Sequence, residues 1–354
     1  MKTRVLIFGS MSSSLAKSQT QSFIDLVQQT IPKVTCQLTI LPSLDSNEES
    51  ENKVFTATSP ADFTHLTNLL LSNQISAFVV EAADLPLNPP EGVDLICTPP
   101  RNTPFDAYLN RQGRIMDEMD PGSHVGVLSM RSKAQLKHLW PDIEFQIMRG
   151  GIDRAMETHM LHSEIDGLIL PAAATEHLGI QGIVAEIFAP EFILPGPGQG
   201  SLVVVGRSND DATRKDLAPL HCHATQVEID AEMAFRRHMI SDSDLPVGVL
   251  ARVTDDEVVI IGSTGACINR VSVNGPLEKA DKVGSGLAMQ ILKSGDALAD
   301  LLEAEFPDGL PPEDDEIDNS DMDQEEADEV DAMDEEIAAL DDDDNFLDPD
   351  EYRA

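Results

Sequence analysis

Short apolar runs of the kind that form buried strands alternate along this chain with amphipathic, helix-like segments. The strand-like runs lie at 5–9, 36–41, 75–80, 124–129, 145–148, 167–172 and 201–207. Segments between them, such as 14–32, repeat apolar side chains at helical spacing. Most of the runs are continuous, which is typical of parallel strands covered by helices on both faces. The pattern predicts an α/β protein that binds its ligand at the carboxyl ends of the strands.

Acidic residues dominate the chain and are concentrated at its end. The net charge is −39 over 354 residues, and residues 307–354 hold 23 Asp or Glu and one Arg. Such a segment buries too little apolar surface to offset its ordering entropy, so we expect a disordered acidic tail. The tail either keeps the protein solvated or recruits a basic protein partner. Because the rest is acidic too, nucleic acid is not an expected partner.

The remaining composition indicates a cytoplasmic protein. No stretch reaches the roughly 18 apolar residues of a membrane span, and no signal peptide or anchor is recognisable. The cysteines are scattered without CxxC pairing at 36, 97, 222 and 267, which argues against a disulfide framework or a zinc site. Adjacent residues rarely point at one ion, so the His-Cys-His triplet at 221–223 is not expected to bind metal.

Two further segments bear on the organisation. Past His221 the pattern changes to two strands around the polar turn 254–257, followed by a helix, which predicts a small α+β module. The glycine-rich segment 195–200 lacks the lysine and spacing of a phosphate-binding loop. We interpret it as a tight turn where the chain crosses between domains.

Four segments, SSSLAKSQTQ (12–21), VVEAADLP (79–86), LSMRSKAQL (128–136) and PGPGQGSL (195–202), occur in a characteristic order. In this order and at these separations they resemble the porphobilinogen deaminase (hydroxymethylbilane synthase) family. The resemblance continues through residues 141–180, with weaker matches at 102–109 and 244–251, and so spans nearly all of residues 1–300.

The resemblance implies two periplasmic-binding-protein-like domains with parallel or mixed sheets, a small α+β third domain and the acidic tail. We expect domain 1 at 1–100 and 196–218, domain 2 at 101–195, domain 3 at 219–306 and the tail at 307–354. It also implies a monomer that takes a small anionic pyrrole substrate.

In that family four porphobilinogen units are deaminated and joined on a dipyrromethane primer, which is thioether-linked to a cysteine. Asp84 falls on the catalytic aspartate, which offsets positive charge developing on the pyrrole nitrogen. Substrate and cofactor carboxylates would be bound by guanidinium forks and a serine, here Arg101, Arg131, Arg149 and Ser13. No metal is implied.

The chain also departs from the family pattern. Arginines of the pattern are replaced by Met11, Ser132, Ala155 and His177, and its lysine by Ala83. Ser243 stands at the position of the attachment cysteine. A hydroxyl is a much weaker nucleophile than a thiolate, which places attachment of the dipyrromethane in question. Cys267 lies in the same small domain but does not align with the lost cysteine.

Two functions remain open. The first is a hydroxymethylbilane synthase-like enzyme of porphyrin and haem biosynthesis. The second is a catalytically inactive homologue that binds a tetrapyrrole or another anionic ligand between its domains. Loss of the attachment cysteine and loss of several arginines affect different steps, and their coincidence favours the second mechanistically.

Overall fold

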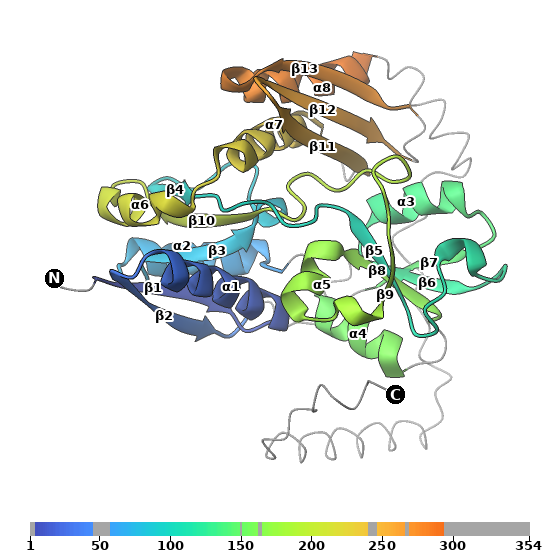
Figure 1. The fold of residues 1–354 in the computed structure, drawn as a ribbon, viewed down its shortest axis with the longest axis horizontal. Helices are drawn as coiled ribbons and strands as arrows, with labels where there is room; N and C mark the ends of the chain where they lie inside the picture. Colours follow the sequence, from blue (N-terminus) through green and yellow to red (C-terminus); the bar gives the residue numbers. More distant parts are fainter. Residues whose placement is uncertain are drawn as a thin grey trace. The chain divides into compact units, whose positions relative to one another are not determined.

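The computed structural model describes residues 4–44, 57–148, 151–161, 165–239, 246–265 and 269–293. Within this range the chain forms three sheets (Figure 1). Among the described helices, none is both long and apolar enough to cross a membrane. The predicted tail at 307–354 lies outside the described residues.

The first sheet has the strand order β2-β1-β3-β10-β4. Its strands are β1 (Arg4–Met11), β2 (Val34–Leu41), β3 (Ala77–Glu81), β4 (Val93–Cys97) and β10 (Leu202–Arg207). The strands β1, β2 and β3 are parallel, whereas β10 runs antiparallel to both β3 and β4. Every residue of β3 is buried, as the continuous apolar run predicted.

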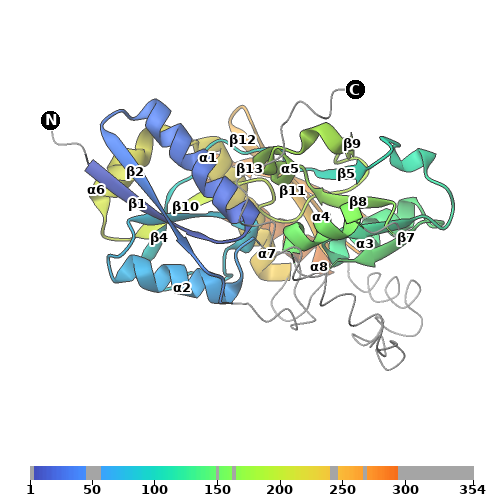
Figure 2. The same cartoon turned by 90° about the horizontal axis from the view of Figure 1, so that it is seen from below.

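Helices cover both faces of this sheet. Figure 2 shows α1 (Ser14–Thr30) and α6 (Asp211–Leu217) on one face and α2 (Pro60–Leu71) on the other. Phe23 and Val27 of α1 pack against β1 and β3, while Leu66 and Leu70 of α2 pack on the opposite face. Helices α1 and α2 each begin at a serine whose hydroxyl accepts a backbone N–H, namely Ser13 for α1 and Ser59 for α2.

The second sheet has the order β7-β6-β8-β5-β9. Its strands are β5 (Asp106–Asn110), β6 (His124–Val127), β7 (Glu144–Ile147), β8 (Gly167–Pro171) and β9 (Val184–Ile187). Its helices are α3 (Met130–Leu139), α4 (Gly151–Leu161) and α5 (Ala172–Leu178). Here β5 is the antiparallel strand, and it lies between β8 and β9.

The two sheets are built in the same way. In each, three parallel strands are followed by one antiparallel strand, which separates them from the last strand of the sheet. The chain crosses from the first sheet to the second between β4 and β5, and it returns between β9 and β10. This arrangement confirms the predicted α/β fold with two mixed sheets.

The third sheet is a small antiparallel one. It contains β11 (Val247–Thr254), β12 (Glu257–Thr264) and β13 (Val271–Pro276), and it packs against α7 (His223–Met239) and α8 (Ala280–Lys293). The hairpin turn holds Asp255 in the left-handed conformation, as a short polar turn allows. The predicted α+β module is therefore confirmed, with β13 as a strand that the sequence did not reveal.

Gln199 connects the two crossing segments. Its side-chain amide donates to Pro104 O (2.8 Å) and to the Asp106 carboxylate (3.0 Å), while its Oε1 accepts from Gly196 N (3.2 Å). The predicted tight turn at 195–200 is present, with Gly198 at φ 78° and Gly200 at φ 74°. A Cβ on Gly198 would lie 2.8 Å from backbone atoms of Ala82 and Ala83, so the loop fits only with glycine at this point.

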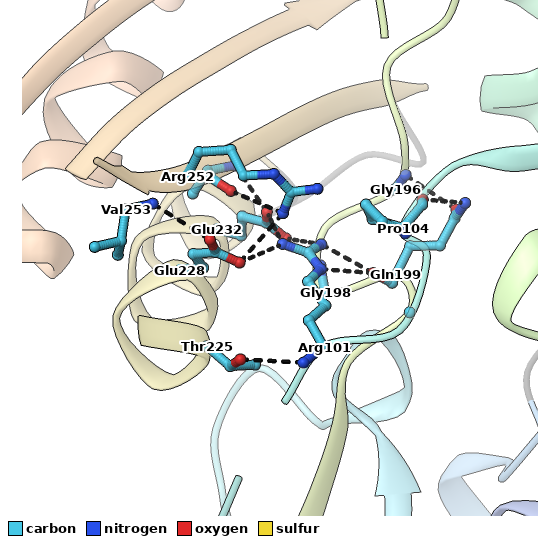
Figure 3. Close-up of polar contacts among 12 residues, drawn as sticks. Arg101, Pro104, Gly196, Gly198, Gln199, Thr225, Glu228, Glu232, Arg252 and Val253 are labelled. Atoms are coloured by element: carbon cyan, nitrogen blue, oxygen red, sulfur yellow. Dashed lines mark hydrogen bonds and ion pairs between the residues drawn. The ribbon is translucent and has the colours of Figure 1, made fainter. Parts of the chain in front are cut away.

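A buried ion pair joins the same crossing segments to α7 (Figure 3). Arg101 donates to both carboxylate oxygens of Glu232, at 2.8 and 3.0 Å. The Glu232 side chain is fully buried and also accepts from Gly198 N (2.7 Å) and Ala251 N (2.8 Å). One carboxylate therefore holds a guanidinium, the crossing loop and a strand of the third sheet.

Replacing Glu232 with Gln should destabilise the protein by about 3 to 5 kcal/mol, because it leaves the buried Arg101 charge poorly compensated. Urea unfolding at pH 7 measures the loss. Glu144→Gln is the matched control, since Glu144 pairs with Lys137 at the surface, and it should cost less than about 1 kcal/mol. Equal losses in the two variants would contradict this role of Glu232.

Candidate functional site

Asp84 lies at the carboxyl end of β3, in a short 3-10 turn formed by Ala82–Asp84. Its Oδ2 accepts a hydrogen bond from Thr58 N at 2.9 Å. The turn follows directly from the central buried strand, and Pro86 comes after it, which prevents continuation as a helix. The candidate catalytic aspartate is thus at the strand edge where α/β proteins place their ligands.

The environment of Asp84 favours its protonated form. Burial raises its pKa well above the usual value, and the negative charge of Glu81 raises it further. The Thr58 N–H and the charge of Arg236 act in the opposite direction. Burial also raises the pKa of Glu81, whose Oε1 accepts from Gly200 N at 2.6 Å. Two neighbouring carboxyls with raised pKa values are a common feature of proton-transfer sites.

Arg236 of α7 holds the Asp84 turn through hydrogen bonds to its backbone. Its Nη1 donates to Ala83 O at 3.0 Å and to Leu85 O at 2.9 Å, the two carbonyls that flank Asp84. The turn is therefore held by α7, by the crossing loop at Gly198 and by the backbone at Thr58. Sequence reasoning did not identify Arg236 or Glu81, although Glu81 is a charged residue at the end of a buried apolar run.

Arg101 has all five of its N–H donors engaged within the protein. Two go to Glu232, one to Glu228 at 3.4 Å, and two to Gln199 O at 3.1 and 2.9 Å. Its side chain is buried. Its predicted role in binding a ligand carboxylate stays a prediction.

Arg131, in the first turn of α3, is held in a similar way. Its two terminal nitrogens donate hydrogen bonds to the Asp106 carboxylate at 2.7 and 3.0 Å. Further bonds go to Leu194 O at 2.8 Å and to Gln199 Oε1 at 3.2 Å. Like Arg101, it binds Gln199 of the returning segment, and its predicted ligand role also stays a prediction.

Ser13 caps helix α1, and its hydroxyl accepts from Ala16 N at 3.3 Å. The next free N–H of the helix, that of Ser14, donates to the carboxylate of Asp153 at 3.0 Å. A helix N-terminus attracts negative charge. In this protein the Asp153 carboxylate, from helix α4 beside the second sheet, lies at the N-terminus of α1.

Several positions where the family pattern has arginine are buried in this chain. Met11 and Ala155 lie in separate apolar cores and expose 1% and 0% of their surface, and Ser132 is buried as well. Leu15 of α1 packs in the same core as Ala155. Burial lowers the pKa of His177, so its ring is a poor substitute for a permanent cation.

These observations test whether the described residues fit a dipyrromethane. Its acetate and propionate carboxylates need cationic partners. The guanidinium groups of Arg101 and Arg131 are instead paired with internal carboxylates, and positions 11 and 155 are apolar. At these described positions the cationic partners are therefore fewer than the family pattern provides. Arg149, Ser243 and Cys267 lie outside the described residues, and no group of three metal-binding side chains occurs among the residues that are described.

Comparisons with known proteins support a single family. Residues 6–215 match the family model of the porphobilinogen deaminase dipyrromethane cofactor binding domain. The chain is 29% identical over 299 residues to a porphobilinogen deaminase of Thermus thermophilus, covering 82% of this chain and 97% of the relative. It is 29% identical over 308 residues to one of Deinococcus radiodurans, covering 85% and 99%. With one of Syntrophotalea carbinolica it shares 31% identity over 230 residues, covering 64% and 73%.

Solved structures give a much weaker likeness. The methionine binding protein MetQ aligns with a TM-score of 0.37 and 11% identity, covering 66% of this chain and 94% of that one. The BenM effector binding domain aligns with a TM-score of 0.36 and 12% identity, covering 61% and 90%. These values are too low to support an argument. The length and collinearity of the sequence matches decide the assignment, and the chain belongs to the porphobilinogen deaminase family.

Proposed function

We propose that this protein acts on porphobilinogen in tetrapyrrole biosynthesis, with Asp84 as the group that assists loss of ammonia. The family reaction is the stepwise deamination and polymerisation of porphobilinogen to hydroxymethylbilane. The observation that carries the proposal is the Asp84 turn, in which a carboxyl with a raised pKa stands at a strand end. The three-domain division at 1–100 with 196–218, 101–195 and 219–306 belongs to the same proposal, as do a cytoplasmic location and a monomeric state.

The chemistry assigned to Asp84 is limited to one step. As the C–N bond of the aminomethyl group breaks, positive charge develops on the pyrrole nitrogen. Asp84 offsets that charge in its ionised form, the less favoured form in this environment, and then accepts the N–H hydrogen bond of the pyrrole nitrogen. The raised pKa makes the carboxylate a stronger acceptor than an ordinary aspartate.

A second candidate function is binding without catalysis. The saturated donors of Arg101 and the apolar surroundings of Ala155 favour it, because both reduce the number of cations available to a pyrrole ligand. Such a protein would bind a tetrapyrrole or another anion between the sheets. Ser243, at the position of the attachment cysteine, supports the same candidate.

Replacing Asp84 with Asn should lower the rate of porphobilinogen consumption by about 100-fold or more, because the amide cannot offset the developing charge. Loss of porphobilinogen and release of ammonia are followed together. The matched control is Asp142→Asn, a change at an exposed position, which should leave the rate unchanged. A native chain that consumes no porphobilinogen would contradict the proposal and favour the second candidate.

The same variant should change how stability depends on pH. Since the Asp84 pKa is raised above 3.8 by folding, its ionisation destabilises the folded state as the pH rises beyond that value. Asp84→Asn should therefore match the native chain near pH 4 and become progressively more stable than it towards pH 7. Urea unfolding at several pH values measures the difference. A variant less stable at pH 7 than the native chain would contradict the raised pKa.

Intact mass tests whether a pyrrole chain becomes attached. If the second candidate is right, the native chain should show no covalent adduct before or after incubation with porphobilinogen, because Ser243 offers only a hydroxyl. The variant Ser243→Cys should gain an adduct if the lost cysteine alone prevents attachment. An adduct on the native chain would show that another residue carries the pyrrole chain and would rule out the inactive candidate.

A further inference from the structure

A pocket of about 270 Å³ lies behind the Asp84 turn, between the segment 85–95 and helix α7. Its wall is mostly apolar and includes Leu85, Pro86, Val93, Ile229 and Met233. This volume is close to the lower end of small-molecule sites, which start at roughly 300 Å³, so a ligand would have on the order of ten heavy atoms.

The charged side chains that line the pocket differ in whether they have an ion-pair or hydrogen-bond partner for their charge. Asp94 pairs with Arg214 at 2.9 Å, and Asp230 accepts from Gln226 Nε2 at 2.8 Å and is also influenced by the charge of Arg237. Arg236 differs from these groups. Among the described residues, no carboxylate lies within ion-pair distance of its guanidinium, which is partly buried. The carboxyl that acts on it electrostatically is Asp84, which lies beyond ion-pair distance.

A partly buried cation without an ion-pair partner, at the wall of an apolar pocket, favours an anionic ligand. Burial works against the charge of Arg236, as its lowered pKa reflects. Only Nη1 of its guanidinium is engaged with the backbone, at Ala83 O and Leu85 O. Nη2 and Nε make no hydrogen bond to the rest of the described chain, so they are available to a carboxylate.

We propose that this pocket is a second binding site, specific for a small apolar carboxylate whose charged end contacts Arg236 and whose body packs on Leu85, Ile229 and Met233. Arg236 also binds the two carbonyls that flank Asp84. A ligand bound in the pocket would therefore contact the same side chain, Arg236, that holds the candidate catalytic turn. The proposal does not depend on the activity proposed above.

Binding is tested by titration calorimetry with 3-phenylpropanoate as the probe and its neutral analogue 3-phenylpropan-1-ol as the control. The carboxylate should bind with a dissociation constant of about 0.1 to 1 mM, as expected for a ligand of this size. The alcohol should bind at least tenfold more weakly. Equal binding of the two compounds, or no binding of the carboxylate, would overturn the proposal.

Variants locate the site. Arg236→Gln should weaken binding of 3-phenylpropanoate at least tenfold, whereas Arg114→Gln, which removes the same charge from a surface ion pair, should leave it unchanged. Met233→Trp should abolish binding by filling the pocket, and this variant keeps the proposal testable if Arg236→Gln fails to fold. Asp84→Asn should still bind the probe. Loss of binding in Asp84→Asn, or its survival in Met233→Trp, would place the probe elsewhere and overturn the assignment.

Discussion

The Glu232 carboxylate is the group on which the arrangement of the three sheets depends. It binds both terminal nitrogens of Arg101 from one crossing segment, Gly198 N from the other and Ala251 N from the third sheet. A buried charge of this kind is tolerated only when every partner is in place. Its loss would remove one contact to each crossing segment and one to the third sheet at the same time.

The Asp84 turn depends on the same framework. The crossing loop can lie against the turn because Gly198 has no Cβ, and α7 carries both Glu232 and, one turn later, Arg236. The helix that holds the framework therefore also holds the carbonyls on either side of Asp84. A carboxyl with a raised pKa costs folding free energy, and this support from three directions keeps it in position.

Much of the fold could be predicted because buried parallel strands are visible as continuous apolar runs. The strands that escaped prediction, β4, β5, β9 and β13, have only four to six residues and contain charged or polar side chains. Asp84 could be identified from its motif, whereas Arg236 could not. The sequence does not show which distant side chains pair with one another. Arg101 and Glu232 are 131 positions apart, and nothing local in the sequence indicates that they form an ion pair. The ligand roles of Arg101, Arg131 and Ser13 remain predictions for the same reason.

The shared strand order of the two sheets also has a consequence for biosynthesis. In the first sheet, β10 separates β3 from β4, yet it is synthesised only after all the strands of the second sheet. Until residue 207 emerges, β3 and β4 each present an unpaired edge. The nascent N-terminal half is therefore open to pairing with other chains for the time needed to synthesise about a hundred residues, some 5 to 20 seconds at typical elongation rates. Chaperone demand should be highest in that interval.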